Sequence, residues 1–401
     1  MFGWELPPHH SGGLGIACYG LTKSLAQLGA HINFILPRKL PYHIPFMKVL
    51  SDQLSANQIS LTAINSLLQA YSTASNYQSQ LSRLTQQELE ARVFGQNLIE
   101  EAHRYGRQAA KWAQHVHHDL IHTHDWMTYP AGIQAKQTSG RPFIAHIHAT
   151  EFDRCAGDHV NQQVAEIEYQ GLSRADKVIA VSQYTKNTVI NKYSIDPNKI
   201  EVIHNGVDLE DVSAIHELSQ LLPGYQTVLF TGRLTIQKGA DYLLKAAQKV
   251  LQYLPKTIFI IAGDGDLRQQ LIMESAWLGI SHRVIFPGFI RDRQQLAKIY
   301  QKADVFVMPS VSEPFGIVPL EALANHKPVI ISKQSGVSEV IDHALKVDFW
   351  DVGHLAETII ACLQYPELRK EMAQQGHREL QNVTWDHAAR KTLALYQRLL
   401  S

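Results

Sequence analysis

Short apolar runs alternate with segments of helical spacing, and this alternation occurs in both halves of the 401-residue chain. Uninterrupted apolar runs are typical of strands that are buried on both faces of a parallel sheet, with helices in the connections. In the second half we expect strands at residues 228–230, 257–261, 284–286, 304–308 and 329–331. The pattern predicts the α/β class, with one parallel sheet in each half of the chain.

The first half shows the same alternation around one less ordered segment. Residues 2–5 are strand-like, and further strands are expected at residues 31–36, 120–123, 143–147, 177–181 and 200–203. Residues 41–92 are rich in Gln, Ser and Asn, and we interpret them as an insertion with helices at 60–68 and 86–94. Because only six residues precede Pro7, either the first strand is short or the native start lies upstream.

Charge balance and cysteine usage exclude several classes of protein. The chain has 37 Lys and Arg against 37 Asp and Glu, so no excess positive charge indicates a nucleic-acid or anionic-membrane surface. Cys18, Cys155 and Cys362 are far apart and form neither a disulfide framework nor a CxxC pair, which is typical of a reducing cytosol. No apolar run reaches the roughly 18 residues of a spanning helix, and no signal peptide is visible. We therefore expect a cytoplasmic protein without a transmembrane segment.

Two glutamates, Glu313 and Glu321, bracket seven residues that follow the expected strand 304–308. A helix is expected to begin near Leu320, so one carboxylate would lie in the strand-to-helix loop and the other on the helix. Backbone N–H groups at the start of a helix attract phosphate. Carboxylates at both ends of a phosphate-binding loop suit a ligand with hydroxyls at both ends, as in a nucleotide sugar.

This spacing resembles the Glu-x7-Glu motif of retaining glycosyltransferases of family 4, which have the GT-B fold. Four further segments resemble motifs of that family, at residues 11–15, 203–208, 232–239 and 262–266. The resemblance implies two Rossmann-like domains that face each other across a cleft. Residues 1–208 would form the acceptor-side domain, to which the C-terminal helix 385–401 crosses back, and residues 209–384 would bind the nucleotide sugar. It also implies transfer of a hexose, with glucose expected, from UDP- or ADP-glucose to a sugar or glucan acceptor.

Four residues are expected to carry the chemistry. When the bond to the diphosphate breaks, negative charge grows on the leaving group. Arg233 and Lys238, five residues apart at a strand end, are suited to stabilise that charge, and the alternative is that both are solvated loop cations. The resemblance places Glu313 against the sugar hydroxyls and His148 beside the donor sugar. The alternatives are a glutamate next to a helix cap and a packed strand histidine, which is how we interpret the nearby His146.

The resemblance assigns further residues to the two substrates. On the donor side, the first loop would close over the phosphates, backbone N–H groups of the motif loop would contact sugar or phosphate, and a helix carboxylate would hold the ribose. These donor-binding residues are Gly12, Gly13, Phe315, Gly316 and Glu321. On the acceptor side, a His-Asp-Trp sequence resembles one found in glycogen- and starch-synthase-like enzymes. The acceptor-side residues are Asp125, Trp126 and Glu151.

Two patterns that resemble metal sites are interpreted otherwise. Asp264-Gly265-Asp266 matches the Asp-x-Asp motif of metal-dependent transferases, but it lies where the resemblance implies a glycine turn. Five histidines, at positions 115, 117, 118, 122 and 124, straddle a helix end, a turn and a strand without regular spacing, and we interpret them as incidental. We expect no obligatory metal or other cofactor besides the nucleotide-sugar co-substrate.

Three other functions remain open. A nucleotide-sugar epimerase or a sugar-phosphate synthase could use the same two-sheet scaffold. A dehydrogenase is less favoured, because residues 12–15 lack the G-x-G-x-x-G spacing and Pro37-Arg38, not an acidic residue, follows the strand 31–36. A non-catalytic sugar-binding protein would tolerate the loss of Glu313 or Arg233.

Overall fold

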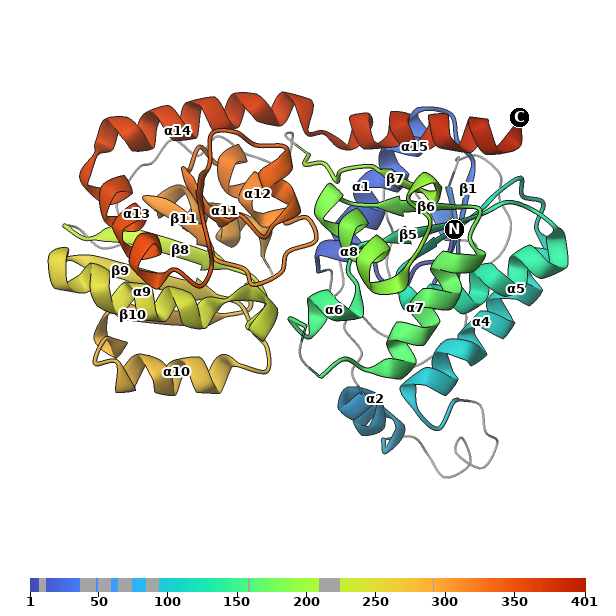
Figure 1. Cartoon of the computed structure of the whole chain (residues 1–401), viewed down its shortest axis with the longest axis horizontal. Helices are drawn as coiled ribbons and strands as arrows, with labels where there is room; N and C mark the ends of the chain where they lie inside the picture. Colours follow the sequence, from blue (N-terminus) through green and yellow to red (C-terminus); the bar gives the residue numbers. More distant parts are fainter. Residues whose placement is uncertain are drawn as a thin grey trace. The chain divides into compact units, whose positions relative to one another are not determined.

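The computed structural model describes residues 1–6, 12–36, 48–49, 59–63, 74–83, 94–157, 159–208, 224–290 and 292–401. The chain divides into two compact units. The N-terminal unit comprises Met1–Glu151, His159–Gly206 and Trp385–Ser401, and the C-terminal unit comprises Phe152–Asp158 and Val207–Thr384. Each unit is built on parallel strands with helices in the connections (Figure 1), so the α/β class is confirmed.

Within the described residues, seven strands form the sheet of the N-terminal unit. They are β1 (Ile32–Leu36), β2 (Lys48–Val49), β3 (Ile59–Ala63), β4 (Ile121–His124), β5 (Phe143–Ile147), β6 (Lys177–Ala180) and β7 (Ile200–Val202). They make two parallel groups, in the orders β1-β3-β2 and β4-β5-β6-β7. Phe2 joins the groups, because it pairs in parallel with Ile35 of β1 and with Thr123 of β4.

Several helices of the N-terminal unit bury apolar residues against the rest of the unit. They are α1 (Gly13–Gln27), α2 (Ala74–Leu81), α4 (Leu98–His115), α5 (Tyr129–Ser139), α7 (Gln162–Arg174), α8 (Gln183–Tyr193) and α15 (Trp385–Leu400), and α6 (Glu151–Arg154) spans the boundary between the units. In α4, the buried residues Ala102, Tyr105, Ala109 and Ala113 recur every three or four positions, as expected for one helix face. Helix α15 packs against α1 (Figure 1), where a Cβ at Gly20 would lie 2.3 Å from the Trp385 ring.

In the part of the C-terminal unit that the structure describes, six strands form the sheet. They are β8 (Gln226–Thr231), β9 (Thr257–Ala262), β10 (Val284–Gly288), β11 (Val305–Met308), β12 (Val329–Ser332) and β13 (Leu345–Val347). Their order is β10-β9-β8-β11-β12-β13, and all neighbours are parallel. The chain therefore adds strands in one direction from β8 to β10 and in the other from β11 to β13. The order reverses between β8 and β11, which makes this pair the switch point of the sheet.

The core of the C-terminal unit follows from the alternation of side chains along its strands. Its helices are α9 (Ala240–Tyr253), α10 (Arg268–Trp277), α11 (Arg293–Lys302), α12 (Val318–Ala324), α13 (Val352–Gln364) and α14 (Pro366–Glu379). Phe230, Phe259 and Val307 share one buried cluster with Leu243 of α9 and Ile359 of α13. Residues of β8, β9 and β11 thus fill the space under α9 and α13.

The structure corrects two expectations in the first half. The strand expected at residues 2–5 is reduced to the single pairing of Phe2. The helix expected at 60–68 is wrong over its first residues, because Ile59–Ala63 alternates apolar and polar residues and pairs with β1 as β3. Its remainder, and residues 86–93 of the other expected helix, lie outside the described residues. Helix α2 and strand β13 were not predicted.

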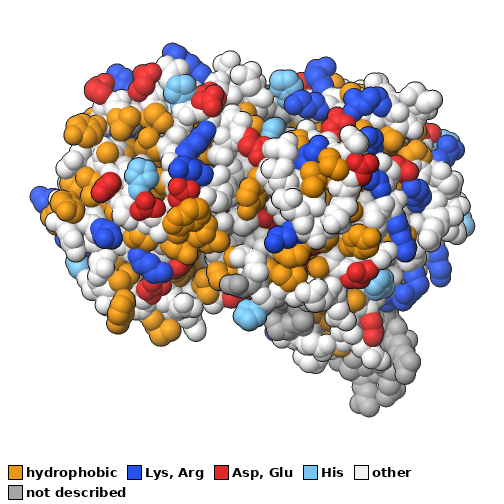
Figure 2. All heavy atoms as spheres, in the orientation of Figure 1, with side chains coloured by type: hydrophobic (Ala, Val, Ile, Leu, Met, Phe, Trp, Pro, Cys, Tyr) orange, Lys and Arg blue, Asp and Glu red, His pale blue; other side chains and the backbone are white. Residues whose placement is uncertain are grey.

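The distribution of charge and the apolar character of the helices bear on the predicted class of protein. Lys and Arg side chains are interspersed with Asp and Glu over the face shown in Figure 2, in keeping with the formal net charge of zero. Within the described ranges, none of the helices combines the length and the apolar character needed to cross a membrane.

Candidate active site

Loops of the C-terminal unit meet at the carboxyl edge of its sheet. The loop after β8 is joined to the loop after β11, since the Val311 N–H donates to the Gln237 carbonyl (2.9 Å). The loop after β11 is joined in turn to the loop after β12, where the Gly336 N–H donates to the Glu313 carbonyl (2.9 Å). Ligands of open α/β sheets bind outside the carboxyl ends of the strands at the switch point. The loops after β8 and β11 are the two that flank it.

Lys238 and Glu313 form an ion pair across these two loops. Their side chains are 18% and 7% exposed, so both charges are largely withdrawn from water. Ser310 Oγ also donates to the Glu313 carboxylate (3.3 Å). The structure thus brings together two of the predicted catalytic residues, a cation and a carboxylate, at the switch point.

Glu321 lies on α12, half-buried, and is held by a short chain of hydroxyl groups. The Tyr300 hydroxyl donates to Glu321 Oε2 (3.3 Å), and Thr231 Oγ1 lies 2.8 Å from the same hydroxyl. Burial and the neighbouring Glu321 charge raise the pKa of Tyr300 well above its usual value, so the phenol keeps its proton and can donate. The second glutamate of the motif is therefore fixed in position at the end of β8.

Two glycines allow the backbone of these loops to pass close to other groups. Gly239 has φ +65°, and a Cβ there would lie 2.0 Å from the Pro309 carbonyl oxygen. Gly316 has φ +97°, and a Cβ would lie 3.1 Å from Glu313 Cγ. Both positions adopt left-handed backbone that other residues rarely take, so glycine is required for local geometry. Phe315, between the motif glutamates, is 2% exposed, and its carbonyl accepts a hydrogen bond from the Val337 N–H (2.6 Å).

Arg233 lies in the same loop as Lys238, at the end of β8, and is half-buried. The backbone on its C-terminal side is tied to the Asp264-Gly265-Asp266 segment, because the Leu234 N–H donates to the Asp264 carbonyl (2.9 Å). The Asp264 side chain accepts from the Gly265 N–H (2.9 Å), so this segment is a local turn. The interpretation of residues 264–266 as a glycine turn is confirmed.

One contact of the motif loop was not predicted. Ser312, next to Glu313, donates a hydrogen bond from Oγ to Asp153 Oδ1 (2.6 Å), and both residues are buried. Asp153 belongs to the segment Phe152–Asp158, which is part of the C-terminal unit although it lies far from it in sequence. Ser312 and Asp153 are 159 positions apart in the sequence, so local sequence patterns could not predict this hydrogen bond.

In the N-terminal unit, the backbone at His148 is held by Asp125. The Asp125 carboxylate accepts from the N–H groups of His148 (2.7 Å) and Ala149 (3.4 Å). Asp125 is 4% exposed and has φ +59°, which is unusual for a residue other than glycine. The predicted acceptor-side residue Asp125 therefore fixes the end of β5, where the predicted catalytic histidine lies.

Four histidines of β4, β5 and the residue after β5 form what we term the histidine stack. Its members are His122, His124, His146 and His148, and the ring centroids of successive partners lie 4.1 to 5.3 Å apart. Burial, followed by the charges of neighbouring histidines, lowers the pKa of the first three well below the usual value, and burial lowers the pKa of His148 to about 3. The expectation that His146 packs inside is confirmed. The interpretation of positions 122 and 124 as incidental overlooked the stack.

The signal for the stack was present in the sequence. Residues two apart on a strand face the same side of the sheet, so His122 and His124 share a face, as do His146 and His148. The sequence does not reveal the register of the sheet, in which β4 and β5 are neighbours and His124 lies opposite His146.

The remaining predicted residues lie in separate places of the N-terminal unit. Trp126 is 4% exposed and packs edge-on against Trp4, with ring centroids 6.2 Å apart. Glu151 begins α6, and its carboxylate accepts from the Asn161 N–H (3.2 Å). Gly12 precedes α1 and Gly13 is its first residue, so Gly13 belongs to a helix and not to an open loop. In the first turn of α1 the Gly15 N–H already donates to the Glu5 carboxylate (2.6 Å).

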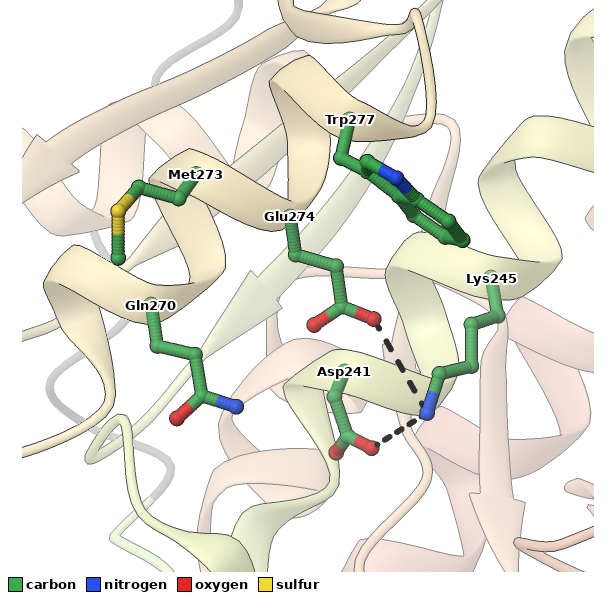
Figure 3. A pocket seen from close by; sticks show the side chains of 6 residues that line it. All are labelled: Asp241, Lys245, Gln270, Met273, Glu274 and Trp277. Atoms are coloured by element: carbon green, nitrogen blue, oxygen red, sulfur yellow. Dashed lines mark hydrogen bonds and ion pairs between the residues drawn. The ribbon is translucent and has the colours of Figure 1, made fainter.

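A separate hollow of about 400 Å³ lies between α9 and α10 (Figure 3). Its lining residues are Asp241, Lys245, Gln270, Met273, Glu274 and Trp277. Lys245 pairs with Asp241 (3.0 Å) and Glu274 (4.0 Å), and so links the two helices. None of the predicted site residues lines this hollow.

Comparison with protein families places the chain among the glycosyltransferases. The family model described as Glycosyltransferase Family 4 matches residues 11–211, and the model described as Glycosyl transferases group 1 matches residues 213–379. The chain is 32% identical over 310 residues to a D-inositol 3-phosphate glycosyltransferase of Salinispora arenicola, which covers 70% of this chain and 68% of the relative. The protein therefore belongs to glycosyltransferase family 4, and it is a transferase enzyme.

Similarity also extends over full-length proteins. An uncharacterized glycosyltransferase of Methanocaldococcus jannaschii is 29% identical over 413 residues, covering 99% of this chain and 97% of the relative. Sucrose-phosphate synthase from Thermosynechococcus elongatus has a TM-score of 0.77 at 22% identity, covering 97% of this chain and 94% of that chain. Anabaena HepE, solved with UDP and glucose, has a TM-score of 0.73 at 19% identity, and the match covers 99% of this chain and 100% of that chain. The chain has the GT-B fold, as the sequence predicted.

Proposed function

We propose that the protein is a retaining hexosyltransferase that moves glucose from UDP- or ADP-glucose to a sugar or glucan acceptor. The observation that carries this proposal is the Lys238–Glu313 pair at the switch point of the C-terminal sheet. An ammonium group can bind the diphosphate of a nucleotide sugar, and an adjacent carboxylate can accept hydrogen bonds from sugar hydroxyls. The similar fold of Anabaena HepE, solved in complex with UDP-glucose, supports a uridine nucleotide as the donor.

Each predicted residue has a role in this reaction. As the bond from the anomeric carbon to the diphosphate breaks, Arg233 and Lys238 stabilise the charge that grows on the leaving group. The acceptor hydroxyl attacks the same face of the sugar and gives its proton to the departing diphosphate, so the anomeric configuration is retained. Glu313 orients the sugar hydroxyls and Glu321 binds the ribose. His148 contacts the donor sugar.

Backbone groups complete the proposed donor site. Phe315 and Gly316, beside Glu313, present main-chain atoms to the sugar or phosphate. Gly12 and Gly13, at the start of α1, allow close approach of the donor phosphates. Because these contacts come from backbone, we expect a larger side chain at Gly316 to weaken donor binding. We propose no metal in the transfer step.

Two classes of acceptor are candidates. Asp125, Trp126 and Glu151 remain our candidates for the acceptor side, and the buried contacts of Asp125 and Trp126 favour an effect through the shape of the site. The names of similar proteins favour a second acceptor class, phosphorylated sugars or polyols. They include D-inositol 3-phosphate glycosyltransferase, sucrose-phosphate synthase and trehalose-6-phosphate synthase. We therefore propose to test both classes.

The test is a donor screen followed by acceptor trials. Binding of UDP-, ADP- and GDP-glucose is measured by calorimetry, and release of the nucleoside diphosphate is then followed with a free sugar, an α-glucan, a hexose phosphate or an inositol phosphate. We expect release to require both one donor and one acceptor, and proton NMR to show an α-linked product from an α-linked donor. Conversion of UDP-glucose alone would favour an epimerase. Wild-type turnover in both Glu313→Gln and Arg233→Ala would contradict the proposed roles.

A further inference from the structure

A cysteine and two histidines lie together at the carboxyl edge of the N-terminal sheet. Cys18 comes from α1, His124 from the last position of β4, and His148 from the residue after β5. One potential ligand atom from each of the three side chains lies within 4.8 Å of the other two. Two of the three residues are fully buried, and the third is partly exposed. The three side chains therefore offer two nitrogen atoms and one sulfur atom as potential ligands in one place.

The topology of the unit explains why these residues converge. The segment at Phe2 pairs with β1 on one side and with β4 on the other, so the order of strands reverses beside β4. Helix α1 follows the Phe2 segment, and its residues therefore face the end of β4. The first of the sheet's helices and the ends of two neighbouring strands supply one side chain each.

The hydrogen bonding of these side chains is incomplete. His124 Nδ1 and His148 Nε2 lie 3.0 Å apart and bond to each other. The other ring nitrogens, His124 Nε2 and His148 Nδ1, are buried and have no hydrogen-bond partner within the part of the chain that the structure describes. Buried polar atoms in proteins are nearly always paired, so unpaired nitrogens on two adjacent rings point to a missing ligand.

The chemistry of the three groups selects a class of ion. Imidazole and thiolate are ligands of Zn²⁺ and of similar divalent ions such as Co²⁺, whereas Mg²⁺ and Ca²⁺ prefer oxygen. The carboxylates of Glu5 and Asp125 lie close enough to Cys18 to act on its thiol electrostatically, and negative charge beside the site favours a cation. Burial and these two carboxylates raise the pKa of the free Cys18 thiol, so a bound cation would have to displace its proton.

A second group of three histidines competes as the site, and its member His146 also has a buried ring nitrogen, Nε2, without a hydrogen-bond partner among the described residues. His122, His124 and His146 also place one nitrogen each within 4.8 Å of the others. In that group His122 is already bonded on both ring nitrogens, to the Tyr396 hydroxyl (2.5 Å) and to His146 (3.2 Å). A metal there would break a contact with α15, whereas Cys18 adds a sulfur ligand without doing so. The observations therefore favour the group that contains the cysteine.

We propose that Cys18, His124 and His148 bind one divalent transition-metal ion of the zinc type. Three protein ligands leave one coordination position open, which is characteristic of zinc sites that accept a further ligand. If His148 contacts the donor sugar, as the proposed function holds, then the bound ion removes that contact and inhibits transfer. This last consequence rests on the proposed function, whereas the binding of the ion does not.

The first experiment is cobalt substitution of the full chain, purified without a histidine tag. Co²⁺ bound by a thiolate gives a charge-transfer band in the near ultraviolet that imidazole ligands do not give. We expect one Co²⁺ per chain with this band, displaced by one equivalent of Zn²⁺. Cys18→Ala should abolish the band, and the matched variants Cys155→Ala and Cys362→Ala should keep it. A band that persists in Cys18→Ala, or no band in the wild type, would overturn the proposal.

The second experiment separates the two groups of ligands by affinity. His124→Asn should weaken Zn²⁺ binding at least tenfold in a competition titration, and His122→Asn should leave it within about threefold. His118→Asn is the control, because His118 is bonded to the Val116 carbonyl (2.8 Å) and Ser139 (3.2 Å) away from the site. Equal weakening by the variants at 122 and 124 would place the ion on the three histidines instead and would refute our assignment. Near-ultraviolet circular dichroism of the metal-free variants verifies that each is folded.

The third experiment tests the link to activity. Zn²⁺ should lower the affinity for the nucleotide-sugar donor in calorimetry, and excess donor should slow the uptake of Co²⁺. If the protein proves not to use a nucleotide sugar, the cobalt spectra are unaffected and the metal site stands. If cobalt spectra confirm the ligands but donor affinity is unchanged by Zn²⁺, the inhibitory consequence is wrong.

Discussion

Removal of either partner of the Lys238–Glu313 pair should destabilise the C-terminal unit, but by different amounts. Lys238→Met leaves a carboxylate that is 7% exposed without its cation. Glu313→Gln leaves an ammonium group that is 18% exposed and lies on a long, flexible side chain that can reach water. The more buried charge costs more to leave unpaired, so the lysine variant should be the less stable one.

The magnitudes follow from burial and hydrogen bonding. Removal of one partner from a fully buried pair costs about 3–5 kcal/mol, and partial exposure places Lys238→Met near the lower end, at about 3 kcal/mol. In Glu313→Gln the amide oxygen can still accept hydrogen bonds from Lys238 and from Ser310, so about 1 kcal/mol is expected. The double variant has no unpaired charge, and its cost should be at least about 1 kcal/mol below the sum of the two.

Urea unfolding of the full chain measures these free energies, and hydrogen exchange of peptides that cover residues 226–231 and 305–308 assigns the change to the C-terminal unit. Lys245→Met is the matched control. Lys245 pairs with Asp241 on the same unit but is 44% exposed, so its loss should cost less than about 1 kcal/mol. Equal costs for the two single variants, or additive costs in the double variant, would refute the reasoning from burial.

Four further outcomes are expected. Arg233→Ala should lower kcat/KM with the identified donor at least about 30-fold, which is roughly 2 kcal/mol of transition-state stabilisation, and unchanged turnover would remove Arg233 from the mechanism. Gly239→Ala should lower the free energy of unfolding by at least about 2 kcal/mol more than Gly279→Ala, because both have positive φ but only the first would place a Cβ against backbone, and equal losses would contradict this. Asp125→Ala should lower kcat about tenfold by releasing the backbone at His148, whereas Asp125→Asn keeps an acceptor oxygen and should recover most of it. Burial lowers the pKa of each histidine in the stack, so below about pH 6.5 the unfolded chain binds more protons than the folded chain. The free energy of unfolding should therefore fall between pH 7 and pH 5, by up to about 1.4 kcal/mol per pH unit for each histidine. Urea unfolding that shows no decrease over this range would be inconsistent with buried neutral rings.

Most of the secondary structure of the C-terminal unit could be predicted because its central strands β8, β9, β11 and β12 are buried on both faces. Apolar runs such as residues 257–261 have no polar face to obscure them, and the helix Ala240–Tyr253 begins directly after Gly239. The strand Leu345–Val347 at the sheet edge was missed because it has only three residues and one of them is a lysine. The domain limits that we predicted, residues 1–208 with 385–401 and residues 209–384, remain a prediction.

Side-chain partners were harder to predict than elements, because they depend on which strands are neighbours. Asp125 and His148 come from the ends of β4 and β5, and their contact needs both the pairing of these strands and the positive φ of Asp125. The sequence shows that the two histidines of each pair are two positions apart. The stack forms only because the neighbouring strands align His124 with His146. Sequence patterns report which face a residue lies on, and tertiary structure decides what that face meets.

The meeting of Lys238 with Glu313 has a more general cause than either motif. The two residues are 75 positions apart, and the intervening chain adds β9 and β10 on one side of β8 before β11 returns to its other side. In a parallel sheet the loops after neighbouring strands lie at the same edge, so the reversal of strand order places the loop after β8 beside the loop after β11. A glycine at position 239 then lets the first loop pass the Pro309 carbonyl of the second without a clash. The pair therefore follows from topology plus one glycine, and a strand order without the reversal would separate the same two motifs even with every residue unchanged.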